Sequence, residues 1–197
     1  MSTNLLILGP QGAGKGTQAA RISAEYGLPH ISTGEMLRDN MARGTELGER
    51  VRPIVDAGEL VPDELMIDLI RDRLSRGDTV PGFILDGFPR TLAQAEALDS
   101  MLMEIGRALD AVLVLDVDEE QAVARLLERA REEGRSDDTP EVIRNRLDNY
   151  RLNTAPLVEW YRARGKAVPI DGEGTIDSVF SQIRHALEHL GARTRVG

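Results

Sequence analysis

A glycine-rich segment that ends in lysine, residues 9–15, is the part of this chain best suited to chemistry. It reads Gly-Pro-Gln-Gly-Ala-Gly-Lys, between a short apolar run and a helical stretch. Glycines let successive backbone N–H groups point inward at phosphate oxygens, and the start of a helix adds a favourable dipole. A plain glycine-rich turn is the alternative. Strand, loop, lysine and helix together favour a phosphate-binding loop, with Lys15 directed at the β- and γ-phosphates of a nucleotide.

The residue after this lysine departs from the usual pattern. Phosphate loops usually carry Ser or Thr there as a direct ligand of Mg²⁺, whereas this chain has Gly16 and then Thr17. The metal is therefore expected to be held mainly by the nucleotide and by water.

Asp86 follows a second buried apolar run, where its carboxylate could hold water on Mg²⁺. A helix cap is the alternative for Asp86, and a surface position is the alternative for Arg90, which is expected to face the same crevice.

Arginines form a further cluster in the second half of the chain. The members are Arg125, Arg129, Arg131, Arg135, Arg144 and Arg146. Arg125 and Arg129 are four residues apart and so share one helix face. Guanidinium groups neutralise and align phosphate oxygens, which is most of what phosphoryl transfer requires. The alternative is a solvated helix paired with Glu128, Glu132 and Glu133, and the phosphate loop favours the first interpretation for some of these arginines.

The elements that position these residues alternate between apolar runs and helical stretches. This alternation predicts an α/β fold with a central parallel sheet flanked by helices on both faces. Strands are expected at 5–8, 29–32, 83–85, 111–115 and 167–170, and helices at 15–26, 63–77, 121–131, 140–164 with a kink at Pro156, and 176–190. Between 33 and 58 short helices are expected, broken at Gly44, Gly48 and Pro53. Asp63 is expected to cap its helix, 132–139 to be a loop, and 191–197 to be frayed.

Composition limits the remaining possibilities. The 197 residues suit a single domain, 1–197, and the net charge of −9 argues against nucleic acid or an anionic membrane as the main partner. The chain has no Cys, and its three histidines, His30, His185 and His189, lack the spacing of metal ligands, so no zinc site is expected. No segment reads as a signal peptide or membrane span, and a cytoplasmic protein is expected.

Five motifs in order resemble the nucleoside monophosphate kinases, and among these the adenylate kinases. They occupy residues 9–18, 33–38, 58–62, 86–90 and 134–138, and the resemblance extends to about Leu190. It includes the glycine after lysine. The resemblance implies a phosphate-binding-loop core with two mobile parts, a monophosphate-binding segment at 32–61 and a lid at 128–138. The lid is of the short type, without structural zinc.

The resemblance also implies roles for individual residues. ATP is expected on Gly12, Ala13, Gly14, Lys15, Gly16, Thr17, Arg125, Arg129 and Gly174. AMP is expected on Thr33, Arg38, Glu59, Leu60, Val61, Gly87, Arg90, Gln94, Arg135 and Arg146. The catalytic set is expected to be Lys15, Asp86, Arg90, Arg129, Arg135 and Arg146. The implied reaction is reversible phosphoryl transfer from Mg-ATP to AMP, which yields two ADP, in a monomer.

Two alternatives remain open. One is a UMP/CMP kinase of the same short-lid form, and the other is a nucleotide-dependent switch or regulatory ATPase. AMP is favoured because a Gln94 carboxamide can pair with adenine. Thr33 and Gln94 also resemble the residues of AMP-specific relatives, whereas pyrimidine-specific relatives tend to carry Ala and Asn. The paired arginines and the two closing segments favour a transferase over a switch.

Overall fold

The computed structural model describes residues 2–133 and 139–193. In these residues the strands are β1 (Thr3–Leu8), β2 (His30–Ser32), β3 (Gly82–Asp86), β4 (Ala111–Asp116) and β5 (Ala167–Asp171). All neighbouring strands pair in parallel, in the order β2-β3-β1-β4-β5. The predicted five-stranded parallel sheet is confirmed. Its order places β1 in the centre, between β3 and β4, so that the segments after these three strands lie side by side.

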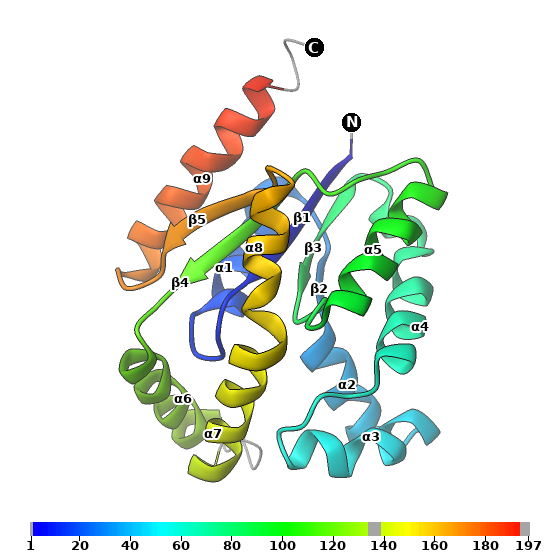
Figure 1. Cartoon of the computed structure of the whole chain (residues 1–197), viewed down its shortest axis with the longest axis vertical. Helices are drawn as coiled ribbons and strands as arrows, with labels where there is room; N and C mark the ends of the chain where they lie inside the picture. The colour runs from blue at the N-terminus through cyan, green and yellow to red at the C-terminus, as the bar shows by residue number, and fades with distance from the viewer. Residues whose placement is uncertain (1, 134–138, 194–197) are drawn as a thin grey trace.

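Helices connect the strands and cover both faces of the sheet (Figure 1). They are α1 (Lys15–Tyr26), α2 (Thr33–Ala42), α3 (Glu46–Asp56), α4 (Asp63–Leu74), α5 (Leu92–Glu104), α6 (Glu119–Glu133), α7 (Pro140–Asn149), α8 (Pro156–Ala163) and α9 (Ile176–Arg193). A short 3₁₀ turn, Gly77–Thr79, precedes β3, and a π-helical turn, Tyr150–Thr154, joins α7 to α8.

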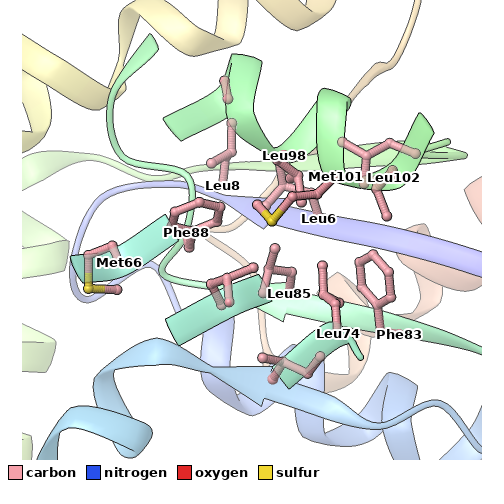
Figure 2. Close-up of a cluster of buried hydrophobic side chains, with 14 of the residues drawn as sticks. Leu6, Leu8, Met66, Leu74, Phe83, Leu85, Phe88, Leu98, Met101 and Leu102 are labelled. Atoms are coloured by element: carbon pink, nitrogen blue, oxygen red, sulfur yellow. The ribbon is translucent and has the colours of Figure 1, made fainter. Parts of the chain in front are cut away.

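Two hydrophobic clusters sandwich the sheet, as the continuous apolar runs predict for strands buried on both faces. One cluster packs α4, α5 and α8 on the face that carries Leu6 and Leu8 of β1. Figure 2 shows part of it, with Leu98 and Met101 of α5 near Leu6. The other cluster packs α1 and α9 on the opposite face, which carries Leu5 and its neighbours on β4. Alternate residues of β1 therefore anchor helices on opposite sides.

The predicted helix breaks at Gly48 and Pro53 are wrong, because both residues lie inside α3. Gly48 serves close packing: a Cβ at this position would lie 2.2 Å from the carbonyl oxygen of Asn40 in α2. Pro53 costs α3 one backbone donor without ending the helix. Only the break at Gly44, between α2 and α3, is confirmed.

Three further boundaries differ from the prediction. Asp63 does not cap α4; it is the first helical residue, after Pro62, and makes no side-chain cap bond. The helix α6 continues to Glu133 and α9 to Arg193, so the predicted loop at 132–139 and frayed tail at 191–197 both start too early. Helix-favouring Arg and Glu residues extend α6 in this way. Residues 134–138 and 194–197 lie outside the described part of the chain.

The kink expected at Pro156 is a π-helical turn. The N–H of Ala155 donates to the carbonyl oxygen of Tyr150 at 2.8 Å, one residue farther back than in an α-helix. Proline at the start of α8 has no N–H to continue the preceding ladder. This turn brings Tyr150 and Thr154 to the large cavity described next.

Candidate active site

One cavity of about 1070 Å³ lies at the carboxyl ends of β1 and β3. This is the place where parallel α/β sheets bind ligands. The segments that follow these two strands line it together with α2, α6, the π-helical turn and the segment after β5. Among the site residues predicted from the sequence, those that line this cavity are Gly12, Ala13, Gly14, Lys15, Gly16, Thr17, Thr33, Arg38, Glu59, Leu60, Val61, Asp86, Gly87, Arg90, Gln94, Arg125, Arg129, Arg146 and Gly174. The remaining one, Arg135, lies outside the described residues.

The segment after β1 forms an open loop whose shape depends on glycine. Gly12 has φ 82°, and a Cβ there would lie 2.3 Å from the carbonyl oxygen of Ala122 in α6. Only glycine fits such a position, because L side chains disfavour positive φ and the neighbouring backbone leaves no space. Gly14, at φ 85°, precedes the first residue of α1. The loop thus ends at a helix N-terminus, which favours anions.

Lys15 is the first residue of α1, and its side chain reaches back to the start of this loop. Its Nζ donates to the carbonyl oxygens of Gly9 at 2.8 Å and of Pro10 at 2.7 Å. Burial lowers the pKa of Lys15 to about 8; the nearby Asp86 carboxylate opposes this shift and the Arg90 guanidinium adds to it. A phosphate group bound beside Lys15 would favour the charged ammonium and so oppose the effect of burial. The ammonium group of Lys15 is therefore positioned to bind an anion.

Asp86, the last residue of β3, lies beside the loop and near His30. The Nε2 atom of His30 is 3.5 Å from Asp86 Oδ2, at the outer limit of a hydrogen bond. Burial acts to raise the pKa of Asp86, but His30 and then Lys15 outweigh it, so this pKa lies below its ordinary value. The carboxylate is accordingly ionised at neutral pH. No partner for His30 could be predicted, since β2 and β3 are separated by about fifty residues in the chain and become neighbours only in the sheet.

Guanidinium groups converge on the other side of the cavity. Arg90 Nε donates to the carbonyl oxygen of Gly87 at 2.8 Å, and Thr154 Oγ1 donates to the carbonyl oxygen of Arg90 at 2.9 Å. Burial lowers the pKa of Arg90, Asp86 opposes the shift, and Arg146 and Arg38 add to it. The group keeps its charge, because an arginine pKa remains far above neutral. Like charges gathered in this way favour the binding of an anion among them.

Arg125 and Arg129 lie on α6, on the loop side. Arg125 donates to the carbonyl oxygens of Gly12 at 3.5 Å and Gly172 at 3.1 Å, and so ties α6 to the phosphate loop and to the segment after β5. Arg129 is close enough to Lys15 to lower the pKa of its ammonium. The predicted face shared by these two arginines is therefore directed at the cavity.

Gln94 is buried at the far end of the cavity and already makes two hydrogen bonds. Its Oε1 accepts from the backbone N–H of Arg90 at 2.7 Å, and its Nε2 donates to Asp63 Oδ1 at 2.7 Å. Thr33 is 1% exposed, and its hydroxyl lies 3.4 Å from the carbonyl oxygen of Asp86. Gly87 packs closely against Thr33, because a Cβ there would meet Thr33 Oγ1 at 2.5 Å.

Glu59 is held by two amides of α7. Asn145 Nδ2 donates to Glu59 Oε1 at 2.9 Å and to the carbonyl oxygen of Ala57 at 2.8 Å. One turn later, Asn149 Nδ2 donates to the carbonyl oxygen of Gly58 at 3.1 Å and lies 3.3 Å from Glu59 Oε2. These four contacts fix the end of the segment 32–61 against the helix that carries Arg146.

Sequence reasoning missed several residues of this site. Asp63, Asn145, Asn149, Tyr150 and Thr154 act through contacts between elements that are distant in the sequence. Only Pro156 gave a local signal, because a proline after a helical stretch indicates an irregular turn. Burial, followed by the charge of Asp116, raises the pKa of Tyr150 to about 12, so its hydroxyl stays neutral.

No group of three or more His, Cys, Asp or Glu side chains that could enclose a metal ion is found in the described ranges, 2–133 and 139–193. The oxygen donors that line the cavity include the carboxylate of Asp86 and the hydroxyl of Thr17. Such a set fits a hydrated Mg²⁺ that arrives with a triphosphate better than a resident metal, because Mg²⁺ retains several waters and binds few carboxylates.

Comparison with known proteins gives one consistent result. A family model of the adenylate kinases matches residues 7–166. The chain is 55% identical over 183 residues to an adenylate kinase from Thermus thermophilus, a match that covers 93% of this chain and 96% of the relative. It is 54% identical over 186 residues to one from Kocuria rhizophila, with 94% and 99% covered. It is 50% identical over 189 residues to one from Caulobacter vibrioides, with 96% and 99% covered. Because the family model covers most of the chain and these relatives are at least 50% identical over nearly its whole length, the chain belongs to the adenylate kinase family.

Proposed function

We propose that this chain transfers the γ-phosphoryl group of Mg-ATP reversibly to AMP and forms two ADP. The observation that supports the proposal is that one cavity contains both a phosphate loop with its lysine and a second cationic group, Arg38, Arg90 and Arg146. A hydrolase or switch needs to bind one nucleotide, whereas two cationic groups suit two phosphate-bearing substrates. Their presence in one cavity allows direct transfer between the substrates.

Each cationic group has a distinct task in this mechanism. The backbone N–H groups of the loop and the ammonium of Lys15 bind the β- and γ-phosphates of ATP, and Arg125 and Arg129 border the ATP end. Arg38 and Arg90 bind the phosphate of AMP. Arg146, with Arg135 from the lid, contacts both phosphate chains while the phosphoryl group moves. These charges stabilise negative oxygens as the transition state forms, which is the main protein contribution to phosphoryl transfer.

The reaction needs no strong general base. An oxygen of the AMP phosphate is already anionic when it attacks the γ-phosphorus of ATP; the bond from that phosphorus to the bridging oxygen breaks, and ADP leaves with the electron pair. The chain must instead exclude water, which would otherwise accept the phosphoryl group. Closure of the segments 32–61 and 128–138 over the nucleotides would supply this exclusion.

Magnesium fits as a companion of ATP. The ion would supply charge neutralisation on the phosphate oxygens. Asp86 is suited to orient water molecules around it, because its carboxylate is ionised, lies beside the loop and has His30 as a neighbour. Thr17, one residue beyond the usual hydroxyl position, is the next nearest candidate. We expect no zinc requirement, because the short lid lacks cysteine.

Comparison of four acceptors tests the proposal. With ATP as the donor, kcat/KM for AMP should exceed that for UMP, CMP and GMP by more than about tenfold, which corresponds to about 1.4 kcal/mol of discrimination. If UMP or CMP came within this range, the UMP/CMP kinase alternative would replace AMP. If ATP were bound or hydrolysed but no monophosphate were phosphorylated, the switch or ATPase alternative would replace the transferase.

Two broader expectations belong to the same proposal. We expect a monomer, since both nucleotide sites are formed within one chain, and we expect it to act in the cytoplasm. Among the described helices, none is both long enough and apolar enough to cross a membrane. Gel filtration with light scattering at the working concentration would test the oligomeric state.

A further inference from the structure

The carboxamide of Gln94 is held at both ends by groups of opposite hydrogen-bonding character. The Arg90 N–H donates to Oε1, and Nε2 donates to Asp63 Oδ1, both at 2.7 Å. A backbone N–H can only donate, and an ionised carboxylate can only accept. Rotation of the amide by 180° would place Nε2 against the N–H of Arg90 and Oε1 against the carboxylate. The two partners therefore permit one orientation of Gln94.

One donor and one acceptor of this amide remain unused. A primary carboxamide has two N–H groups and two acceptor positions on oxygen, and the contacts to Asp63 and Arg90 use one of each. Gln94 is 2% exposed overall, yet it lines the cavity, so the unused pair is available only on that side. The order of donor and acceptor presented to a ligand is thus fixed in space.

This fixed order can distinguish two kinds of purine. A 6-aminopurine presents an amino donor at position 6 and an acceptor at N1, whereas a 6-oxopurine presents an acceptor at position 6 and a donor at N1. A freely rotating carboxamide could match either base by turning over. A carboxamide locked by Arg90 and Asp63 matches one of them and leaves unpaired groups against the other, which is costly in a buried site.

Asp63 performs this role from outside the cavity. It is the first residue of α4, two residues after Val61, and it does not line the cavity. Its Oδ1 also accepts from Thr91 Oγ1 at 3.0 Å, and Thr91 in turn caps α5 by accepting from the Gln94 N–H at 3.2 Å. The carboxylate is therefore held from a second side, and it links the end of the segment 32–61 to the start of α5.

We propose that Asp63 is a positioning residue that sets base specificity: it locks the Gln94 amide so that the acceptor site takes a 6-aminopurine monophosphate and rejects a 6-oxopurine. The inference rests on the proposed function, in which Gln94 faces the acceptor base. It makes Asp63 a determinant of substrate choice without any contact between Asp63 and substrate.

The test compares AMP with inosine monophosphate, which differ only at position 6 and N1. In the unmodified protein kcat/KM should favour AMP by about 100-fold or more. Asp63→Ala should reduce this ratio by about tenfold or more, with KM for ATP changed by less than about twofold, because only the Arg90 N–H then opposes rotation of the amide. Asp63→Asn keeps an acceptor oxygen but adds an amide donor, so its ratio should lie between those of the unmodified protein and Asp63→Ala.

Glu64→Ala is the matched control, because Glu64 is the neighbouring acidic residue in the first turn of α4, is exposed, and makes no contact with Gln94. It should leave the ratio unchanged. A loss of helix stability alone would lower the melting temperature of Asp63→Ala without changing the AMP-to-inosine ratio, and that result would overturn the proposal. So would an Asp63→Asn variant that discriminates less well than Asp63→Ala.

A second measurement does not depend on how the variants fold. In the unmodified protein, the Gln94 side-chain amide should give an NMR signal with at least one proton protected from exchange in the absence of nucleotide. Rapid exchange of both protons would overturn the proposal. Failure of the unmodified protein to phosphorylate AMP would instead refute the proposed function, while the amide measurement would still report on the Asp63 contact.

Discussion

At the scale of single residues, Lys15 carries a charge that must accompany the moving phosphoryl group. Lys15→Met removes this charge but keeps the length and most of the apolar volume of the side chain. We expect turnover to fall about 100-fold or more, with KM for AMP changed far less, because the missing interaction belongs to the ATP end and to the transition state. Steady-state kinetics with both substrates varied would measure this, and near-normal turnover in a folded variant would refute the role of the loop.

The lowered pKa of Lys15 predicts a pH effect. In the free protein this pKa is about 8, so the ammonium is present below pH 8 and lost above it. We expect kcat/KM for ATP to fall as the pH rises above about 8, whereas kcat should persist to higher pH, because bound phosphate stabilises the ammonium. Since the unfolded chain keeps its proton up to about pH 10.5, the stability contribution of this residue should rise with pH across that window.

Asp86 is expected to act through the metal. Asp86→Asn removes the negative charge without changing the shape of the side chain, so the concentration of Mg²⁺ required for half-maximal activity should rise severalfold. Asp116→Asn is the matched control, because Asp116 ends β4 on the other side of β1, is exposed and does not line the cavity. Titration of activity with Mg²⁺ at fixed ATP would compare the two. Equal Mg²⁺ requirements in both variants would contradict the assignment.

Residue types and spacing were informative wherever a motif is contiguous. The loop 9–15 and the pair Asp86 and Arg90 could be placed at one crevice because each follows a buried strand. The partners of Gln94 and Asp86 could not be found in this way. Asp63 and His30 reach them from other elements, and nothing local in the sequence distinguishes a buried histidine beside a carboxylate from an exposed one.

At the scale of elements, Asn145 and Asn149 connect α7 to the end of the segment 32–61. A double change of both residues to Ala removes four donor contacts to Ala57, Gly58 and Glu59. We expect KM for AMP to rise severalfold, because the residues after Gly58 lose their support, while KM for ATP stays nearly constant. Each lost hydrogen bond should also lower the free energy of unfolding by about 1 kcal/mol.

A matched control lies on the same helix. Asp148 is exposed on α7 and pairs with Arg151 rather than with the segment 32–61. Asp148→Ala should leave KM for AMP unchanged and should alter stability by less than about 1 kcal/mol, as is typical of exposed ion pairs. If the double variant raised KM for ATP as much as KM for AMP, the contacts would matter for general stability and not for the acceptor site.

Helix ends and interruptions were harder to predict than the existence of most helices, although α5 was not among the helices expected. Glycine and proline stop many helices, but Gly48 instead allows α2 and α3 to pack closely, and Pro53 lies where one missing N–H is tolerated. The π-helical turn at Tyr150–Thr154 likewise depends on tertiary contacts, including the bond from Thr154 to Arg90. Local preference was outweighed by packing in each case.

At the scale of the whole molecule, the alternation of apolar runs and helices was sufficient to predict a parallel sheet covered on both faces. The strand order β2-β3-β1-β4-β5 could not be read from the same pattern. The order depends on which strands each connection crosses. This in turn depends on how α1 and α9 pack on one face of the sheet and how α4, α5 and α8 pack on the other. This order brings the segments after β1 and β3 together, and thereby forms the cavity.

The last prediction concerns motion of the molecule around that cavity. The segment 32–61 forms one wall, and α6 with α7 forms another, held together by Leu126, Ile143 and Leu147. Figure 1 shows these two walls below opposite halves of the sheet, with α2 and α3 on one side and α6 and α7 on the other. Since the sheet is buried between α1 and α9 on one face and α4, α5 and α8 on the other, we expect these elements to stay rigid while the walls close over the bound nucleotides.

Hydrogen exchange would measure this closure. A bisubstrate analogue that joins the two nucleotides should slow exchange strongly in 32–61 and 128–138, whereas amides of β1 and β3 serve as the internal control and should change little. ATP alone should protect chiefly 128–138, and AMP alone chiefly 32–61, because each wall is expected to contact one nucleotide. Protection of both segments by the analogue, but by neither substrate alone, would show that the walls close as one unit through the contacts of Asn145 and Asn149. Unchanged exchange in both segments would contradict closure altogether, and water would then have to be excluded by the nucleotides themselves.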